Sequence, residues 1–527
     1  MKRALFIIFY CTLFWVVKAA TVLPISDIYS WSKTDLNPYI GKTVSFPVPV
    51  YVNDDGSTLT VSPRHAVTGT EVALPGSIEW ANQSVTNAAG SFQLTGAGSH
   101  RLGETVENLT VKVNSSSSVS FVSGNWVANS RNQLLAGPDM SLIDKRGEHN
   151  ILVCAMNLEY YLVSNWGEGY GPNNKSQHNK QRKKISQALA LINADLYGLV
   201  EVQKGTAALQ EIADDLKKIT GRNFKLISSP SSAQGTYTQS AFVYCSDVLI
   251  PALQHVIEVG GGPSDRRLMM MFQDTLYSGE TFIFSINHFK SKTGSGTGDD
   301  SDHNDGQGSH NGTRTREAQA VFSAYDSKRK MFQEDDILIM GDLNAYSMED
   351  PIRLFVDTGM TNLHKYFYHN ESYSYRYKNQ VGVLDHALVN STLLPQVTGM
   401  LAFHINSDED DCHTYNGSCA DETIFRSSDH DPILVGLRLD STAQIITDNT
   451  YINNDGIYST HKDIVVYNAK RDNNNAYYTI YTIAGQIYEQ GELNSNEHVI
   501  RHPQYPGVYI VSIYANGQIK QFKIIVQ

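Results

Sequence analysis

The spacing of hydrophobic and polar positions changes twice along the chain and predicts three regions of different structure. Residues 21–145 carry short alternating runs such as GKTVSFPVPVYV, which predict an all-β domain. Residues 146–440 alternate apolar runs with segments of helical spacing, which predicts a mixed α/β domain whose sheets are covered on both faces. Residues 441–527 return to a β pattern and end in two alternating runs joined at Asn516 and Gly517, a pair favoured in tight hairpins.

The middle region contains the clearest individual elements. Residues 180–194, KQRKKISQALALINA, place Ile185 and Leu189 on one helical face. Residues 205–221 predict a second amphipathic helix, for which Gly221 is a suitable C-terminal cap. The predicted strands are ILVCAMN, LYGLVEV, SAFVYCS, TFIFSINHF, DILIMGDLNA, GVLDHALVN and DPILVGL.

Residues 1–20, MKRALFIIFYCTLFWVVKAA, have the composition of a secretory signal peptide. Lys2 and Arg3 precede an apolar stretch from Ala4 to Val17, which is short for a membrane span. An uncleaved anchor is the alternative. We therefore expect an exported protein.

Four cysteines remain after such a signal is removed, and export permits disulfides. Cys412 and Cys419 bracket the turn-forming stretch HTYNGS, which predicts a disulfide that closes a short loop. Cys154 and Cys245 each lie in an apolar, strand-like run. Two buried thiols and a bridge between strands are both compatible with that pattern.

Predicted strands of the middle region repeatedly end in residues suited to metal or phosphate. Each residue alone has an ordinary explanation as a turn cap, a solvated loop residue or a buried histidine. Strand ends gather at one rim of a sheet, however, so the recurrence predicts a common site. The residues are Asn157, Glu201, Asn287, His288, Asp342, Asn344, Asp385, Asp429 and His430.

These residue types suit hydrolysis of a phosphate ester. Hard oxygen ligands such as Glu201 and Asp429 favour Mg²⁺, Mn²⁺ or Ca²⁺ over Zn²⁺. A histidine beside a carboxylate can act as general base on water. The chain contains no G-x-S-x-G motif and no P-loop. Its formal net charge of -12 argues against a simple electrostatic DNA binder, unless divalent cations bridge the protein to phosphate.

The motifs MNLEYY, LVEVQ, NHFKSK, GDLNAYS, LDHALV and SSDHDPI together resemble the endonuclease/exonuclease/phosphatase superfamily. The resemblance covers roughly residues 146–440. It implies the DNase I-like fold, a four-layered α/β sandwich of two packed sheets with its site at the strand ends. The expected fold class is therefore multidomain, with this sandwich between two β domains.

The resemblance also implies roles for the residues near metal and phosphate. Asn157, Glu201 and Asp429 would belong to the metal shell. Asp342 and Asn344 would orient water and phosphate.

A second set of roles concerns proton transfer. His430 would be the general base, and Asp385 would orient it. His288 resembles the second histidine of the DNase I branch, which contacts phosphate or acts as acid. The carboxylate partner of that histidine is not evident in the sequence. Asp431 is interpreted as a turn acid.

The stretch NHFKSKTGSGTGDDSDHNDGQGSHNGTRTREAQAV resembles an acidic, glycine-rich insertion of bacterial extracellular nucleases. NKQRKKI resembles the basic helix start of the same subfamily. Both imply phosphate contacts, with a solvated basic face as the alternative. The acidic run is expected to be a flexible loop, and a Ca²⁺ site is the alternative. The candidate phosphate contacts are Arg182, Lys290, Lys292, Arg314 and Arg316.

The flanking regions carry weaker resemblances. LGETVENLTVKV resembles an OB-type β-barrel domain, which implies a module that binds a nucleic acid strand. The alternative is that this domain is only a spacer. The segments YTIAGQIYEQGEL and GVYIVSIYANGQIKQFKIIV resemble the C-terminal sorting domain of proteins exported by type IX secretion. That resemblance implies a Gram-negative bacterium, the type IX machinery as partner and an extracellular location. An ordinary β-sandwich module is the alternative.

Together these features predict a secreted, divalent-metal-dependent phosphodiesterase, most readily a sequence-nonspecific endonuclease acting on DNA or RNA. One alternative is a phospholipid phosphodiesterase such as a sphingomyelinase, or an inositol phosphate phosphatase, of the same fold. Another is a surface-binding protein that has lost catalysis.

Overall fold

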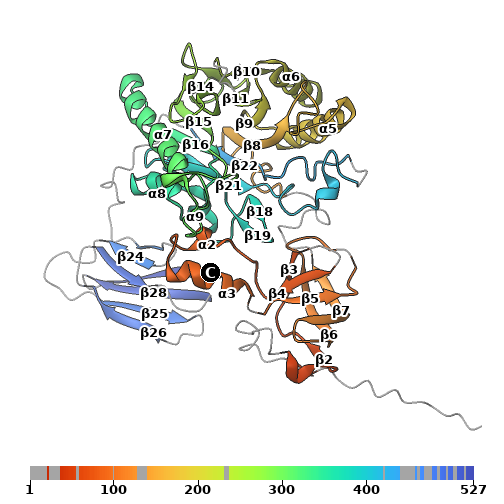
Figure 1. Cartoon of the computed structure of the whole chain (residues 1–527). Helices are drawn as coiled ribbons and strands as arrows, with labels where there is room; N and C mark the ends of the chain where they lie inside the picture. Colours follow the sequence, from red (N-terminus) through yellow and green to blue (C-terminus); the bar gives the residue numbers. More distant parts are fainter. Residues whose placement is uncertain are drawn as a thin grey trace, which may run out of the picture. The chain divides into compact units, whose positions relative to one another are not determined.

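The computed structural model divides the chain into two compact units, residues 1–441 and 442–527 (Figure 1). In the first unit the described residues are 21–22, 36–54, 58–88, 90–98, 100–127, 139–230, 237–418 and 422–439. In the second they are 457–459, 463–467, 477–482, 487–493, 497–501, 507–515 and 518–526. Within these ranges no helix has the length and apolar character needed to cross a membrane.

Five strands near the N-terminus close into a ring. Strand β3 pairs with β4, β4 with β5, β5 with β7, β7 with β6, and β6 again with β3. The β5–β7 pair is parallel and the other four are antiparallel. The elements are β1 (Thr21–Val22), η1 (Asn37–Tyr39), β2 (Thr43–Ser45), β3 (Val50–Asp54), β4 (Leu59–Ser62), β5 (Phe92–Thr95), β6 (Thr105–Val113) and β7 (Ser118–Val127).

A helical excursion, which we call the arm (residues 63–88), interrupts this ring between β4 and β5. It contains α2 (Gly69–Val72) and α3 (Ile78–Ala88). The prediction that residues 21–145 are entirely β was wrong here. The sequence IEWANQSVTNA lacks the alternation of a strand, and the Ser77 hydroxyl accepts the Trp80 amide at 3.1 Å near the start of α3.

Two mixed sheets form the centre of the first unit. The first sheet has the order β10-β11-β9-β8-β22-β21 and the second β12-β14-β15-β16-β20-β17, with β13 beside β14. The first sheet comprises β8 (Ile151–Tyr161), β9 (Leu196–Gln203), β10 (Phe224–Ser228), β11 (Thr238–Cys245), β21 (Val397–Ala402) and β22 (Ile433–Leu437). The second comprises β12 (Leu249–Pro251), β13 (Ile257–Glu258), β14 (Arg267–Asp274), β15 (Thr281–His288), β16 (Ile337–Asp342), β17 (Thr361–Asn362) and β20 (Asp385–Val389).

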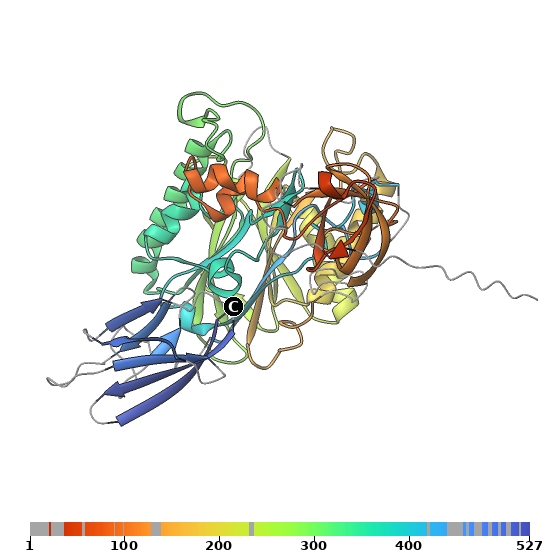
Figure 2. The ribbon, with the colours of Figure 1, turned by 90° about the horizontal axis from the view of Figure 1, so that it is seen from below.

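Helices cover the outer faces of both sheets, with α5 and α6 on one side and α7 and α8 on the other (Figures 1 and 2). The predicted C-terminal cap at Gly221 is confirmed, with φ of 77° in the left-handed region. The helices are α5 (Lys175–Ile192), α6 (Ala207–Thr220), α7 (Asn311–Phe332), α8 (Asp350–Asp357) and α9 (Leu363–Tyr368). Smaller elements are η2 (Ser264–Arg266), η3 (Gly298–Asp300), η4 (Leu394–Gln396), η5 (Asp411–His413) and the hairpin β18 (Tyr375–Tyr377) with β19 (Gln380–Gly382).

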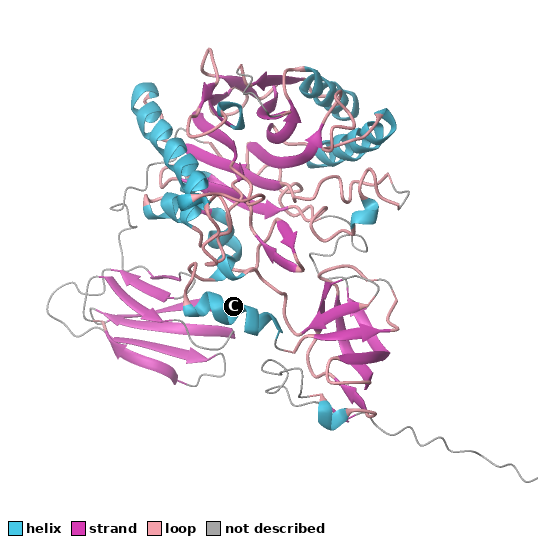
Figure 3. Ribbon diagram, in the orientation of Figure 1, coloured by secondary structure: helices cyan, strands magenta, loops and turns pink. Residues whose placement is uncertain are grey.

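Alternation along β8 shows how the layers are packed. Ile151, Val153 and Ala155 point into the core between the two sheets, and Leu152 and Cys154 point into the core beneath α5 and α6. A third core lies between the second sheet and helices α7 and α8. These three cores define four layers in the order helix, sheet, sheet, helix, which Figure 3 shows by element type.

The cysteines divide as the sequence allowed. Cys154 and Cys245 are free, buried thiols, so the bridge between strands is excluded. Cys412 is disulfide-bonded, and its predicted partner Cys419 lies outside the described residues.

The second unit contains two antiparallel sheets, with orders β23-β24-β27 and β26-β25-β28-β29. Its predicted final hairpin is confirmed by the pairing of β28 with β29, which places Ala515 opposite Gln518. The strands are β23 (Ile457–Ser459), β24 (Asp463–Tyr467), β25 (Tyr477–Thr482), β26 (Ile487–Glu492), β27 (Glu497–Arg501), β28 (Gly507–Ala515) and β29 (Gln518–Val526).

Candidate active site

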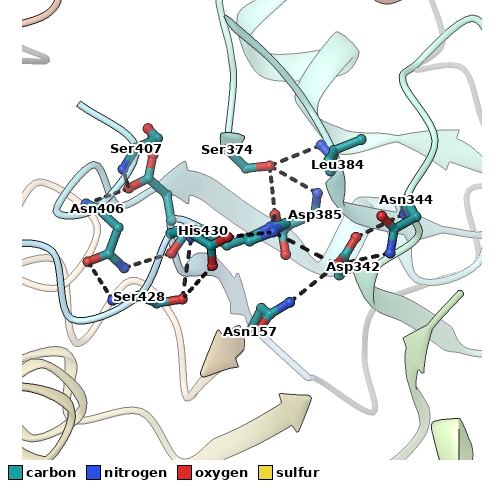
Figure 4. A network of polar contacts seen from close by, with 12 residues as sticks. Asn157, Asp342, Asn344, Ser374, Leu384, Asp385, Asn406, Ser407, Ser428 and His430 are labelled. Carbon is teal, nitrogen blue, oxygen red and sulfur yellow. Dashed lines mark hydrogen bonds and ion pairs between the residues drawn. The ribbon is translucent and has the colours of Figure 1, made fainter. Parts of the chain in front are cut away.

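Strand ends from both sheets of the first unit meet at one rim, as the sequence predicted. Asp342 ends β16, Asp385 begins the antiparallel β20, and the two face each other in register. His288 ends β15 and lies opposite Asp342 in the neighbouring parallel pair. His430 comes from the loop that precedes β22 in the other sheet, and Figure 4 shows it reaching Asp385.

His430 and Asp385 form a buried pair. The His430 Nδ1 atom lies 2.6 Å from Asp385 Oδ2, which also accepts the Ser374 hydroxyl at 2.8 Å (Figure 4). The Tyr375 ring stacks on the imidazole with centroids 4.5 Å apart. The carboxylate and the ring together fix the orientation of the imidazole, so that Nε2 is the nitrogen free for chemistry.

The charge of His430 depends on its acidic neighbours. Burial would lower the pKa of His430, but the carboxylates of Asp385, Asp429 and Asp342 outweigh it and hold that pKa well above 6.5. The Nε2 atom is 3.9 Å from one oxygen of Asp342 and 3.9 Å from one of Asp429. A cation bound at Asp429 would weaken the effect of that carboxylate on His430.

Asp342 organises the centre of the site. Its carboxylate accepts the Asn344 amide at 2.9 Å, the Asn344 side chain at 3.2 Å and the Asn157 side chain at 3.2 Å. Burial raises the pKa of Asp342 to about 7. The side chain of Asn344 also donates to the Phe289 carbonyl at 3.1 Å, which ties this loop to the end of β15.

A second group of acids lies beside Asp342. Burial and the Asp429 charge raise the pKa of Glu201 to about 7, and the same two causes raise that of Glu159 to about 8. The Glu159 Oε2 atom is buried without a hydrogen-bond partner among the described residues. We call Glu159, Glu201, Asp342 and Asp429 the acidic cluster. Crowded carboxylate oxygens of this kind fit a hard divalent cation.

Backbone geometry explains why these side chains converge. Regular pairing of β8 with β9 breaks after Asn157, and Glu159 and Tyr160 have φ of 50° and 53°. Glu201 in β9 also has a positive φ, of 58°, and accepts the Tyr160 amide at 3.1 Å. Bulges of this kind re-aim side chains at the ends of strands.

Among the described residues, the three acid or histidine side chains whose donor atoms lie close enough together to hold a metal are Asp342, Asp385 and His430, within 4.8 Å of one another. Because His430 Nδ1 is hydrogen-bonded to Asp385, we assign those two residues to proton transfer. Asp342 also belongs to the acidic cluster, so it links His430, the candidate general base, to the candidate ligands Glu201 and Asp429.

His288 has a different environment from His430. Its Nε2 atom lies 3.5 Å from Glu201 Oε1 and 3.7 Å from Asp342 Oδ2. Burial, together with the nearby cations of Arg266 and His430, lowers the pKa of His288 well below 6.5. His288 is therefore a neutral hydrogen-bonding group, and its nearest carboxylates belong to the acidic cluster.

Four of the five predicted phosphate contacts are engaged elsewhere. Arg182 of α5 makes two hydrogen bonds to Asp215 and one to Glu211, all on α6, at 2.7–2.8 Å. Arg316 pairs with Asp299 and Asp300 of its own acidic insertion. The prediction that these two guanidinium groups are free for phosphate was therefore wrong, because local acids neutralise them.

The other two engaged cations are buried. Arg314 is fully buried and donates to the carbonyls of Ser309 and Gln307 at 2.8 Å. Lys292 binds both oxygens of the buried Glu349, at 2.6 and 2.5 Å. Both cations are taken up by contacts that hold the insertion in place, which does not support their predicted role as phosphate contacts.

Lys290 stays a candidate phosphate contact, and Arg266 is a second candidate near it. The Lys290 ammonium contacts only the Ser291 hydroxyl among the hydrogen bonds of the described residues. Arg266, which sequence reasoning missed, influences both His288 and Lys290 electrostatically. Its Nε atom is buried without a hydrogen-bond partner among the described residues. The doubled arginine before the apolar run LMMMF was the available signal.

Asp431 is not the turn acid that the sequence suggested. Its side chain is fully buried, and one oxygen accepts the amides of Ile405, Asn406 and Ser407 at 2.8–3.1 Å. The other oxygen lies 2.8 Å from His404 Nδ1. Asp431 therefore holds a neighbouring loop in place directly beside His430.

The fold and the strand-end site are those of a family of phosphoester hydrolases. A family model described as "Endonuclease/Exonuclease/phosphatase family" matches residues 149–430, just over half of the chain. The chain therefore belongs to that family, whose members are generally dependent on divalent metals.

Solved structures show likeness in fold alone. The human Nocturnin catalytic domain is 13% identical, with 54% of this chain and 93% of that chain covered and a TM-score of 0.37. A family member from Bacteroides thetaiotaomicron is 15% identical, with 55% and 97% covered and a TM-score of 0.39. A mannosyl-6-phosphatase from the same organism is 16% identical, with 55% and 100% covered and a TM-score of 0.38. No curated protein matches the chain.

Proposed function

We propose that this protein is an exported, Mg²⁺-dependent endonuclease that hydrolyses DNA, and also RNA, with little sequence preference. The family supplies phosphoester hydrolysis, and the choice of nucleic acid rests on a run of tyrosines beside the acidic cluster. That run is the observation that carries the proposal.

The Tyr160 ring contacts that of Tyr170, which in turn contacts that of Tyr237, and the Tyr160 amide donates to Glu201. Centroids of the first two rings lie 5.0 Å apart at an interplanar angle of 21°, and those of the second and third lie 6.4 Å apart. Tyr170 is 51% exposed and Tyr237 40% exposed. Exposed aromatic faces next to a phosphate site are suited to stacking with bases of a single strand, without sequence choice.

The residues of the site then divide the chemistry between them. Glu201 and Asp429 would hold the cation, which when bound would neutralise phosphate charge and stabilise the leaving oxygen. His430 would take a proton from water at Nε2, while Asp385 keeps the imidazole oriented. Asp342 and Asn344 would orient the water and the phosphate.

The anionic groups of the substrate would meet Lys290, Arg266 and neutral His288. These contacts would grip phosphates, which carry no sequence information. Because the chain has a net charge of -12, binding would be weak without a divalent ion and would weaken further as salt rises.

The flanking domains support an exported nuclease. The ring of β3 to β7 has the strand order first, second, third, fifth, fourth, with third and fifth parallel, which is the connectivity of OB-type barrels. We assign it to strand binding. The second unit would be the sorting domain that addresses the protein, in a Gram-negative bacterium, to the type IX secretion machinery and the cell exterior.

The test compares one preparation on supercoiled plasmid, structured RNA, sphingomyelin vesicles and p-nitrophenyl phosphate, with and without Mg²⁺. We expect Mg²⁺-dependent nicking of plasmid and slower cleavage of RNA. Rapid hydrolysis of the lipid or the monoester without nicking would overturn the nuclease assignment and leave the family standing.

A matched pair of variants tests the stacking surface itself. Tyr170→Ala should raise KM for a single-stranded oligonucleotide and leave KM for an abasic oligonucleotide unchanged. Tyr170→Phe keeps the ring and should behave as wild type on both. Equal effects of Tyr170→Ala on the two substrates would remove base stacking from the proposal.

A further inference from the structure

The arm carries a glutamate that is buried in the α/β part of the first unit. Glu71 lies on α2, labelled in Figure 1, and is 1% exposed. One of its carboxylate oxygens, Oε2, accepts the amide of Ser347 at 3.2 Å and the amide of Val383 at 3.1 Å. The other oxygen binds the Lys365 ammonium, which also donates to the Glu71 carbonyl at 2.9 Å.

These two amides belong to the two segments that carry the catalytic acids. Ser347 follows Asp342 and Asn344 in the loop after β16. Val383 stands two positions before Asp385, at the start of β20. A single oxygen from the arm therefore bridges the loop that orients phosphate and the strand that orients the base.

Lys365, the cation that neutralises Glu71, belongs to a helix that also contacts the segment of Asp385. Lys365 lies on α9 next to His364, whose Nε2 is 2.9 Å from the Asp385 carbonyl. His364 thus contacts the Asp385 backbone directly, and Glu71 contacts the same segment two positions earlier, at Val383.

A second contact of the arm is linked to the segment after β15 through Glu349. The Thr70 hydroxyl donates to Glu349 Oε1 at 2.7 Å, and the Thr70 carbonyl accepts the Met348 amide at 2.9 Å. Glu349 is the acid that binds Lys292, four positions beyond His288. The arm is therefore linked to the chain next to each of the three strand ends in the second sheet that carry site residues.

We propose that Glu71 is a positioning residue and that the N-terminal domain completes the active site. Docking alone could be achieved with apolar side chains, and burying a carboxylate is costly unless specific bonds repay it. Here the bonds join two catalytic segments that are distant in sequence. The proposal requires only the phosphoester hydrolysis of the family and is independent of the choice of nucleic acid as substrate.

The first experiment measures kcat and KM for bis(p-nitrophenyl) phosphate with Mn²⁺, well below the melting temperature of each variant. Glu71→Ala should lower kcat roughly 10- to 100-fold with little change in KM, because displaced reacting groups cost rate more than binding. The matched control is Asn87→Ala. Among the described residues the Asn87 side chain bonds the backbone of Val67 and the Gln83 side chain, all within the arm, so its loss should lower Tm and leave kcat unchanged.

A rescue distinguishes positioning from general stability. Glu71→Gln retains an acceptor for the two amides but turns an NH₂ group toward the Lys365 ammonium, so kcat should fall. Adding Lys365→Met removes that conflict and should return kcat to within a few-fold of wild type. Lys365→Met should not rescue Glu71→Ala, which has no acceptor.

Hydrogen exchange supplies a readout that needs no activity. In Glu71→Ala the amides of Ser347 and Val383 should exchange faster, while amides in the centre of β16 remain protected. Wild-type kcat in Glu71→Ala, or unchanged exchange at both amides, would overturn the proposal. Faster exchange at both amides in a preparation that hydrolyses no phosphoester would support the positioning and refute the function instead.

Discussion

Neighbouring residues of one type have very different roles in this site. Asp429 and Asp431 flank His430. Asp429 belongs to the acidic cluster, whereas Asp431 is fully buried and accepts hydrogen bonds from three backbone amides. Environment, and not residue type, separates the proposed metal ligand Asp429 from the structural acid Asp431. This distinction sets what each substitution should do.

The buried His430–Asp385 pair predicts a large and shared loss of rate. His430→Ala should lower kcat by roughly 10²- to 10⁴-fold, the usual contribution of a general base. Asp385→Asn should cause much of the same loss, because His430 loses its orienting carboxylate. In the double variant the losses should not add, since the two residues act as a unit. Near-normal kcat in both folded single variants would place the base elsewhere.

The crowded acids predict dependence on a divalent cation. EDTA should abolish hydrolysis, and Mg²⁺ or Mn²⁺ should restore it. Glu201→Gln should raise the cation concentration needed for half-maximal rate, because it removes a hard anionic ligand. The rise of Tm on adding the cation should also need more cation in Glu201→Gln than in wild type, since a ligand that binds only the native state raises Tm. Full activity in excess chelator would exclude the metal site.

At the scale of elements, strands and helices were predictable where one pattern held for several turns or residues. The strands that carry Asn157, Glu201, His288 and Asp342 were found because their apolar runs stop abruptly at these polar residues. The roles of the basic residues were not predictable in this way, because the sequence does not show that Asp215 of α6 pairs with Arg182. The contacts of the arm with Ser347 and Val383 likewise join segments hundreds of residues apart, which no local pattern reports.

The loop held by Asp431 contains an acid that should make stability depend on pH. Asp408 is buried and accepts the Tyr373 hydroxyl at 2.7 Å. Burial, with a contribution from Asp431, raises the pKa of Asp408 from 3.8 to about 6. Between pH 3.8 and about 6 the native state therefore binds more protons than the unfolded chain. The contribution of Asp408 to stability is present below pH 3.8 and is lost as pH rises to about 6.

Asp408→Asn should remove that dependence. The difference in Tm between variant and wild type should change steadily between pH 4 and about 6 and become constant above pH 7. Thermal unfolding followed by circular dichroism across this range would measure it. Parallel curves for the two proteins would show that Asp408 does not titrate in this interval.

At the scale of the whole molecule, the three textures of the sequence correspond to the N-terminal ring, the layered α/β part and the second unit. What the sequence did not reveal is the dependence between the first two. The arm leaves the ring, and its Glu71 is buried against Ser347 and Val383, so the domain boundary drawn near residue 145 does not separate independent parts.

The second unit should be dispensable for catalysis. Removing residues 442–527 leaves the first unit whole, with every site residue and the arm. Its kcat, KM and Tm should therefore equal those of the full chain. In the native host, the shortened chain should accumulate inside the cell, because the proposed sorting address is lost. The matched comparison is Glu71→Ala in the full chain, which retains the address and should be exported but slow. A shortened chain that folds yet loses hydrolysis would show that the second unit helps to build the site, and export of that chain would refute the sorting role.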